Sequence, residues 1–368
     1  MAQEQKLRSG FTTGAAAAAG ALAGVLLLSG EKKETVEFLS LDNTPLSIPI
    51  QNVKLTENGA KAEVVKDSGD DPDITNGVSI FTEVRFVSYT DKIVFKAGEG
   101  IGTVTKKGLS VGVGEPAINP GPKKLITSLI SPFLKENVGV EVIISIPGGE
   151  NLAKKTLNPT LGILGGLSVI GTTGVLRPMS EEGFKNALLP QIDVAKAAGF
   201  DSLIFAPGKI GERIAVSQGL PKDAIVETSN FIGFMLDAAK ERKISSVLLF
   251  GHLGKLAKVA AGVFHTHNRV GDARMETIAA YGAAEGLTKT NVKRILNANT
   301  TEEAVSVLDE ENLTTKVCDR IAKRASERAE RYAFNELRVG TLLVTLKGRV
   351  LGMDEKAKEI MMELKSHG

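Results

Sequence analysis

Apolar and polar residues alternate in two different patterns along the chain. Up to residue 96, short runs rich in β-branched residues alternate with turn residues, which is typical of strands. Strands are predicted over residues 35–41, 46–55, 60–66, 78–88 and 92–96. An alanine-rich run precedes them, with Thr12 and Thr13 as candidate N-caps and Gly30 at its end. Because this run is apolar on nearly every side, we expect a buried helix followed by a sheet.

From residue 140 onward, strand-like apolar runs alternate with longer helical patterns. Strands are predicted over residues 141–146, 168–170, 202–205, 224–226 and 246–250. Helices are predicted over residues 181–198 and 231–242, and after Gly211. This alternation predicts a parallel sheet with right-handed crossovers.

The breaks between these patterns divide the chain into three segments. A proline-rich connector at residues 115–122 leads into a predicted helix over 125–135. Beyond residue 277 the chain is helical and charged, and it ends in a predicted hairpin and a last helix over 354–365. The sequence therefore predicts an α+β N-terminal domain (1–138), an α/β ligand-binding domain with a mainly parallel sheet (139–290) and a helical segment with a terminal hairpin (291–368).

Composition narrows the range of partners. The 368 residues carry a net charge of +2, without tryptophan and with 5% aromatic residues, so we expect no nucleic-acid partner. The single cysteine, Cys318, cannot form an internal disulfide and fits a reducing cytoplasm. The apolar run 15–28 is too short to span a bilayer and lacks a clean signal-peptide cleavage site. We expect a cytoplasmic protein without a membrane partner.

Two glycine turns follow β-rich segments in the second pattern. They are Pro147-Gly148-Gly149-Glu150 and Gly171-Thr172-Thr173-Gly174. Glycine permits close backbone approach, so the N–H groups of such turns can meet an anion or a nucleotide moiety at the carboxyl edge of a parallel sheet. They predict a nucleotide-sized ligand, although glycines that only make tight turns would give the same pattern.

The spacing of the residues in three motifs argues against the function that each motif suggests. Gly254-Lys255 follows a strand, but Leu249 and Leu256 stand where a phosphate loop needs glycine and Ser or Thr. Ser110 lies in a G-x-S-x-G match that is followed by the proline-rich connector and not by a helix. The acidic run 67–73 lacks calcium-loop spacing and is interpreted as a turn. The residues alone leave the reaction open.

Longer motifs carry a family resemblance. Residues 10–14 (GFTTG), 66–73 (KDSGDDPD), 114–122 (GEPAINPGP), 251–256 (GHLGKL) and 264–267 (FHTH) occur in this order. So do residues 147–150 (PGGE), 154–159 (KKTLNP), 171–174 (GTTG) and 229–233 (SNFIG). Together they resemble the CbiD-type cobalt-precorrin-5B C1-methyltransferases of anaerobic cobalamin synthesis over residues 7–274.

The chain departs from the family pattern at four positions. The pattern has cysteine at Ala16, histidine at Asn76, serine at Asn268 and alanine at Gly271. We therefore give neither Ala16 nor Asn76 a catalytic role.

The resemblance implies methyl transfer from S-adenosylmethionine to C1 of cobalt-precorrin-5B, a cobalt-containing tetrapyrrole, to give cobalt-precorrin-6A. The methyl donor is then expected at Gly148, Gly149, Gly171, Thr172, Thr173, Gly174 and Asn230. The macrocycle carries carboxylates, which call for cations, and we expect them to be Lys255, Lys258, Arg269 and Arg274. His265 and His267 are the predicted catalytic residues, since a ring proton must be managed.

Three alternatives stay open at this point. The first is another S-adenosylmethionine enzyme on a related tetrapyrrole, and the second is a non-catalytic tetrapyrrole carrier or pathway scaffold. The third is a metal-dependent hydrolase built on His252, His265 and His267. We expect no metal site, because three imidazoles without an acidic partner make an incomplete ligand shell. The oligomeric state is also open, a homo-oligomer included.

Overall fold

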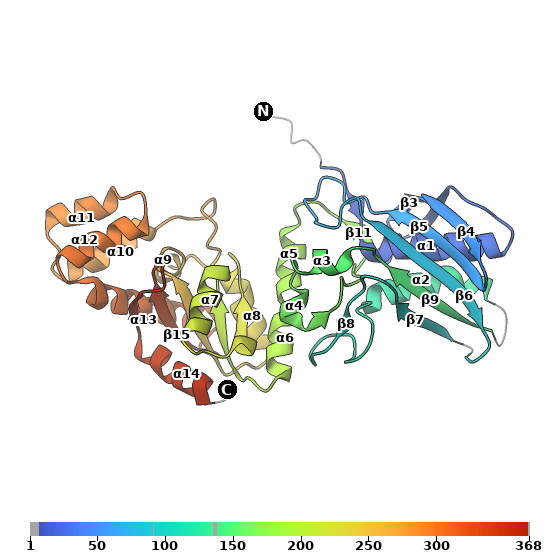
Figure 1. Ribbon diagram of the computed structural model, residues 1–368. Helices are drawn as coiled ribbons and strands as arrows, with labels where there is room; N and C mark the ends of the chain where they lie inside the picture. Colours follow the sequence, from blue (N-terminus) through green and yellow to red (C-terminus); the bar gives the residue numbers. More distant parts are fainter. Residues whose placement is uncertain (1–6, 91, 135–137, 367–368) are drawn as a thin grey trace. The chain divides into compact units, whose positions relative to one another are not determined.

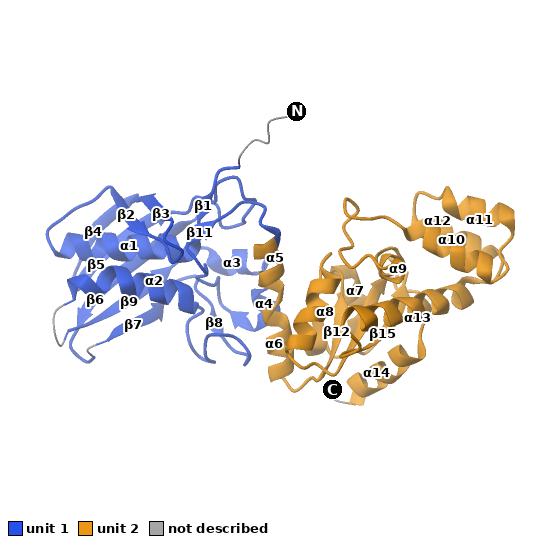
Figure 2. Cartoon of the chain, turned by 180° about the vertical axis from the view of Figure 1, so that it is seen from behind, with its two compact units in different colours: residues 1–181 blue, residues 182–368 orange. Residues whose placement is uncertain are grey.

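The computed structural model describes residues 7–90, 92–134 and 138–366, which fall into an N-terminal unit (residues 1–181) and a C-terminal unit (residues 182–368) (Figure 2). This division differs from the three predicted segments. Strand β9 (Gly139–Ser145) pairs with strands of the N-terminal unit, so the predicted boundary after residue 138 would cut through one sheet. The C-terminal helices likewise share a unit with the parallel sheet.

The N-terminal unit is built on a mixed sheet in the order β4-β5-β6-β9-β7 (Figure 1). The remaining strands of this unit form two-stranded pairs, β1-β11, β2-β3 and β8-β10. The strands are β1 (Gly10–Phe11), β2 (Thr35–Leu39), β3 (Pro45–Pro49), β4 (Asn52–Thr56), β5 (Gly59–Val65), β6 (Ser79–Val87), β7 (Ile93–Ala97), β8 (Thr103–Val104), β10 (Ile163–Leu164) and β11 (Val175–Leu176). The predicted strand 46–55 is thus two strands, and the predicted strand 168–170 contains a single isolated bridge, between Val169 and Ile118.

Helix α1 (Thr13–Leu28) is the core of this unit, as the alanine run predicts. Thr12 caps it by accepting a hydrogen bond from the Ala15 N–H at 3.2 Å. A Cβ atom on Gly24 would lie 2.6 Å from Val84, so small residues let the helix contact the sheet closely. The other helices are α2 (Pro120–Ile130), η1 (Ser131–Phe133), α3 (Gly149–Ala153) and α4 (Asn158–Leu161).

The C-terminal unit contains the predicted parallel sheet. Strands β13 (Ile225–Glu227), β12 (Ser202–Ala206), β14 (Ser246–His252) and β15 (Arg338–Val344) are parallel, and β16 (Val350–Met353) adds an antiparallel edge. The helices are α5 (Glu181–Leu188), α6 (Pro190–Ala197), α7 (Lys209–Ser217), η2 (Lys222–Ala224), α8 (Ile232–Glu241), α9 (Leu253–Ala261), α10 (Arg274–Ala284), α11 (Lys289–Leu296), α12 (Thr301–Glu310), α13 (Thr314–Tyr332) and α14 (Glu355–Ser366). The predicted terminal hairpin is β15-β16, and its first strand completes the parallel sheet.

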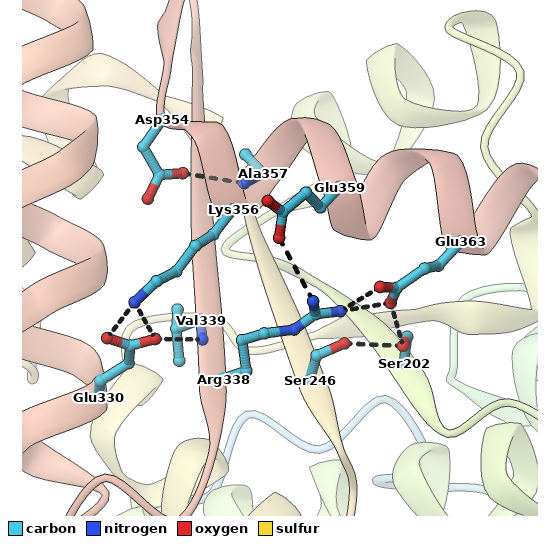
Figure 3. A network of polar contacts seen from close by, with 10 residues as sticks. All are labelled: Ser202, Ser246, Glu330, Arg338, Val339, Asp354, Lys356, Ala357, Glu359 and Glu363. Atoms are coloured by element: carbon cyan, nitrogen blue, oxygen red, sulfur yellow. Dashed lines mark hydrogen bonds and ion pairs between the residues drawn. The ribbon is translucent and has the colours of Figure 1, made fainter.

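Polar side chains at the amino edge of this sheet have structural partners (Figure 3). Arg338 starts β15 and binds Glu363 of α14 at 2.5 Å. Ser246 donates to Ser202 at 2.7 Å, which joins the first residues of β14 and β12. These contacts hold the terminal helix against the sheet. Ligands of open parallel sheets bind at the other, carboxyl edge.

Two further observations bear on function. Cys318 is fully buried in α13, and burial raises the pKa of its thiol to about 12, so the thiolate needed for a nucleophile does not form near neutral pH. Among the residues that the structure describes, no helix combines the length and the apolar character needed to cross a bilayer.

Candidate functional site

A cavity of about 320 Å³ lies at the carboxyl edge of the C-terminal sheet. From β12 the chain continues to β13 on one side, and from β14 it continues toward β15 on the other, so the carboxyl ends of β12 and β14 form a topological switch point. The cavity is lined by Asn230, His252, Gly254, Lys255, Lys258, Thr266, His267, Asn268 and Arg274.

Lys255 forms hydrogen bonds with the segments that follow two of the neighbouring strands. Its Nζ donates to Pro207 O at 2.9 Å, Ser229 O at 3.3 Å and Asn230 Oδ1 at 2.9 Å. Pro207 follows β12, Ser229 follows β13, and Lys255 itself lies on α9 after β14. Ser229 has a φ of 51°, a left-handed conformation that is costly for a residue other than glycine, and the lysine satisfies its carbonyl.

Lys258 lies one turn further along α9, and it is only 1% exposed. Its Nζ donates to Thr266 O at 3.1 Å and to Asn268 Oδ1 at 2.6 Å. The Thr266 N–H donates to Asn230 O at 2.9 Å. The segment after α9 is therefore hydrogen-bonded both to the buried Lys258 and to Asn230, which follows β13.

The charge of these two lysines is not directly balanced. In the described part of the chain, neither ammonium group has an ion pair with a carboxylate; their acceptors are carbonyl and amide oxygens. Burial lowers the pKa of both Lys255 and Lys258, against the opposing effects of Glu227 and Asp272 respectively. Since buried charges in proteins are normally paired, the cavity favours an anionic ligand.

Arg274 and Arg269 occupy different places. Arg274 lines the cavity and forms a bidentate pair with Asp272 at 2.7 and 2.6 Å, which raises the pKa of the guanidinium. Arg269 is exposed and does not line the cavity. Of the four predicted substrate cations, the structure thus brings Lys255, Lys258 and Arg274 together.

The hydrogen bonds of two cavity histidines define their tautomers when the rings are neutral. His267 Nδ1 accepts from the Arg269 N–H at 3.2 Å, so the proton lies on Nε2. His252 Nδ1 accepts from the Gly254 N–H at 3.2 Å, and its Nε2 contacts Glu302 at 3.1 Å. His252 therefore caps α9 and binds α12, whereas His267 presents an N–H donor.

His265 differs from its neighbour. Its ring packs against Phe231, with centroids 5.0 Å apart, and it does not line the cavity. The rings of His265 and His267 lie 6.4 Å apart, on a non-helical segment between α9 and α10. Over the described ranges, no group of three or more His, Cys, Asp or Glu residues is arranged to hold a metal ion.

The predicted methyl-donor residues divide between the two units. Gly148, Gly149 and the turn 171–174 belong to the N-terminal unit, whereas Asn230 lines the cavity of the C-terminal unit. A Cβ atom on Gly149 would lie 2.3 Å from Gly100 O. One on Gly171 would lie 2.2 Å from Thr12 Oγ1, in the segment that pairs with this turn. Close packing accounts for these two glycines.

The sequence alone did not identify several residues of the site. Pro207, Ser229 and Thr266 contribute backbone carbonyls to the lysines, and a backbone acceptor leaves no trace in residue type. Asn268 departs from the family pattern, and its side chain accepts a hydrogen bond from Lys258. Its position next to His267 was the one available hint.

The fold and site define a class: an α/β unit whose switch-point cavity is lined by the cationic side chains of Lys255, Lys258 and Arg274, of which Lys258 is fully buried. The comparisons with known proteins go further, and the chain belongs to the CbiD family, as the sequence motifs indicated. The family model described as CbiD matches residues 1–178, and the model described as CbiD, C-terminal domain, matches residues 265–355.

Curated relatives cover nearly the whole chain. One is the cobalt-precorrin-5B C(1)-methyltransferase of Moorella thermoacetica, 47% identical over 97% of this chain and 98% of the relative. The protein of the same name from Methanocaldococcus jannaschii is 47% identical over 95% and 96%. A crystal structure of the cobalamin biosynthesis protein cbiD from Archaeoglobus fulgidus is 28% identical and covers 73% of this chain and 84% of that chain, with a TM-score of 0.39.

Proposed function

We propose that the chain is an S-adenosylmethionine-dependent methyltransferase that methylates C1 of cobalt-precorrin-5B to give cobalt-precorrin-6A. The observation that carries the proposal is the near end-to-end similarity, at 47% identity, to relatives of that name. The two cavity lysines support it, because neither has an ion pair with a carboxylate in the described part of the chain, Lys258 is fully buried, and the macrocycle and the methyl donor both carry carboxylates.

The size of the cavity limits what it can hold. About 320 Å³ is at the lower end of the range of roughly 300–1,000 Å³ that is usual for ligand pockets. A four-ring macrocycle does not fit inside it, but one carboxylate-bearing arm does, and so does the amino-acid end of the methyl donor. We propose that the cavity binds such a carboxylate group.

The residues present divide the work of binding. Bound S-adenosylmethionine supplies an electrophilic methyl group, so the protein must chiefly align the reactants and exclude water. Lys258 and Arg274 supply positive charge, and His267 donates through Nε2. Lys255 keeps Asn230 and the neighbouring carbonyls in place. His265 packs on Phe231 and does not line the cavity, so it is better suited to supporting the segment that carries His267 than to proton transfer.

The two glycine turns remain predicted contacts of the methyl donor. Gly148 is the member of that set with open space around its missing side chain and a φ of 76°, so its backbone can approach a ligand.

The direct test is methyl transfer with the wild-type protein. Incubation with S-adenosylmethionine labelled in the methyl group and with cobalt-precorrin-5B should move the label to the macrocycle, as read by mass spectrometry. Macrocycle binding without label transfer would contradict the proposal and support the carrier alternative.

A further inference from the structure

A row of aromatic rings leads away from the cavity. It begins at His267, which lines the cavity, and continues through His265 and Phe231 to Phe184 of α5. The centroids of successive rings lie 6.4, 5.0 and 5.7 Å apart. We call these four residues the aromatic row. All of them belong to the C-terminal unit, as the cavity does, so the row and the cavity adjoin on one unit.

Backbone pairing brings three of the rings to one side. Phe231 and His265 form an isolated antiparallel bridge, and the Thr266 N–H donates to Asn230 O beside it at 2.9 Å. Directly paired residues of antiparallel segments carry their side chains on the same face. The ring of His267, two residues after His265, lies 6.4 Å from the His265 ring and extends this side toward the cavity.

The row has a buried centre and exposed ends. Phe231 is 9% exposed, and the ammonium group of Lys185 lies 5.1 Å from the centre of its ring. Phe184, by contrast, is 54% exposed, and His267 is exposed as well. A single exposed phenylalanine needs no explanation, but one that continues a row of rings out of a cationic cavity adds an apolar surface to a polar site. This combination indicates a ligand with an apolar face and a carboxylate.

Two ligands of the proposed reaction carry a flat group and a carboxylate, and the charge of the cavity distinguishes them. In the methyl donor the carboxylate belongs to an amino-acid end, where an ammonium group lies beside it. Within the described chain, the side chains that line the cavity include the cations of Lys255, Lys258 and Arg274 and no aspartate or glutamate. These cations repel an ammonium group, whereas the carboxylate arms of a tetrapyrrole bring no positive charge with them. The cavity therefore favours an arm of the macrocycle.

We propose that the aromatic row binds one face of the cobalt tetrapyrrole while a carboxylate arm of the same molecule enters the cavity. The proposal rests on the proposed function. The faces of the macrocycle are largely apolar and its carboxylates lie around its rim, so it needs aromatic rings next to cations. His267 lies where the two parts meet, because its ring belongs to the row and also lines the cavity. The row selects the face and the cavity selects the arm, which together fix the orientation of the substrate.

The first experiment removes the exposed ring. In Phe184→Ala, cobalt-precorrin-5B should bind about fivefold to fifteenfold more weakly, the contribution expected from covering the exposed half of a phenylalanine side chain. The affinity for S-adenosylhomocysteine should be unchanged, and the variant should unfold at the wild-type urea concentration. Calorimetry measures both affinities.

Phe334→Ala is the matched control, since it removes the same side chain from a position that is 73% exposed. The Phe334 ring lies 4.6 Å from the ammonium group of Lys240 in the last turn of α8, whereas Phe231 precedes the first turn of that helix. This variant should bind both ligands as the wild type does.

The second experiment reports proximity directly. Because the chain has no tryptophan, Phe184→Trp introduces a single one and keeps a ring in the row. A cobalt macrocycle quenches the fluorescence of a tryptophan in contact with it. Titration with cobalt-precorrin-5B should therefore quench Phe184→Trp strongly and Phe334→Trp much less, and S-adenosylhomocysteine should quench neither. Phe184→Trp should also keep the wild-type affinity for the macrocycle.

The outcomes separate this proposal from the function on which it rests. Unchanged affinity for cobalt-precorrin-5B in Phe184→Ala, or equal quenching at the two positions, would overturn the row as a binding surface. A loss of affinity for S-adenosylhomocysteine instead would assign the row to the methyl donor, and a change of oligomeric state alone would assign it to a contact between copies. Weaker macrocycle binding by Phe184→Ala, in a protein whose wild type transfers no methyl group, would overturn the proposed function and leave the binding surface standing.

Discussion

Replacing Lys255 by methionine should lower the free energy of unfolding by about 2–4 kcal/mol, because the change leaves Pro207 O and Ser229 O without their donor and Asn230 Oδ1 with only the long contact from Thr266 Oγ1 at 3.5 Å. Each unsatisfied buried acceptor costs about 1–3 kcal/mol, and water entering the partly exposed site offsets part of the sum. The Ser229 turn should lose its conformation, and binding of carboxylate ligands should be lost with it. Urea unfolding and calorimetry measure the two effects.

The matched control is Lys293→Met, which removes the same charge from an exposed position of α11. It should leave both measurements close to those of the wild type. If Lys255→Met unfolds at the wild-type urea concentration, the lysine does not organise the strand ends and is only a surface cation.

Lys66→Met should have the second-largest effect, in the N-terminal unit. The Lys66 side chain is 1% exposed, and its Nζ binds Asp73 Oδ2 at 2.8 Å and Ser68 Oγ at 2.5 Å. Removing one partner of a buried pair costs about 3–5 kcal/mol, and we expect about 2–3 kcal/mol because Asp73 is 27% exposed. Urea unfolding at neutral pH measures this loss.

The loss should depend on pH. Burial alone would raise the pKa of Asp73, but the bonds from Lys66 and the Thr75 N–H outweigh it and lower the pKa. A carboxyl group with a lowered folded-state pKa stabilises the fold above its unfolded pKa of about 3.9 and loses that contribution as pH falls through the lower folded value. The difference between wild type and Lys66→Met should therefore shrink below about pH 4. A difference that stays constant down to acid unfolding would show that the ion pair is not its source.

The acidic loop shows what sequence reasoning could reach. Its interpretation as a turn agrees with the contacts of Lys66 and Asp73 and with the bidentate pair of Arg8 and Asp67. What spacing could not show is that Lys66 is buried, because a lysine between a strand and an acidic turn is ordinarily solvated.

Helix α1 and strand β9 show which features of the fold the sequence could predict and which it could not. The alanine run and the cap at Thr12 are local features, and they predicted a buried helix correctly. The apolar run of β9 predicted a strand equally well, but its partners β6 and β7 are far away in the sequence. Periodicity reports the faces of a strand and not the sheet to which it belongs, so the domain boundary was misplaced.

For the site, residue type and motif order identified Lys255, Lys258, Arg274 and His267, which the structure gathers around one cavity. Residue type and motif order did not show the different roles of these four side chains. Whether a lysine donates two or three hydrogen bonds, or which histidine nitrogen accepts a backbone N–H, depends on atoms that only the fold brings together.

The central claim is that this cavity binds a carboxylate through its unbalanced positive charge, and Asn230→Asp tests it most directly. The substitution keeps the Oδ1 acceptor that lies 2.9 Å from Lys255 Nζ and adds one negative charge to the cavity. Asn297→Asp adds the same charge at the exposed end of α11. Calorimetry with S-adenosylhomocysteine and with cobalt-precorrin-5B, in separate titrations, shows which carboxylate is bound.

Asn230→Asp should fold as stably as the wild type and should bind one of the two ligands about tenfold to a hundredfold more weakly, since a charged hydrogen bond is worth about 1.5–3 kcal/mol. Weaker binding of S-adenosylhomocysteine would show that the cavity binds the carboxylate of the methyl donor. Weaker binding of cobalt-precorrin-5B would show that it binds a carboxylate of the macrocycle. Wild-type affinity for both ligands in Asn230→Asp, equal to that of Asn297→Asp, would contradict the account.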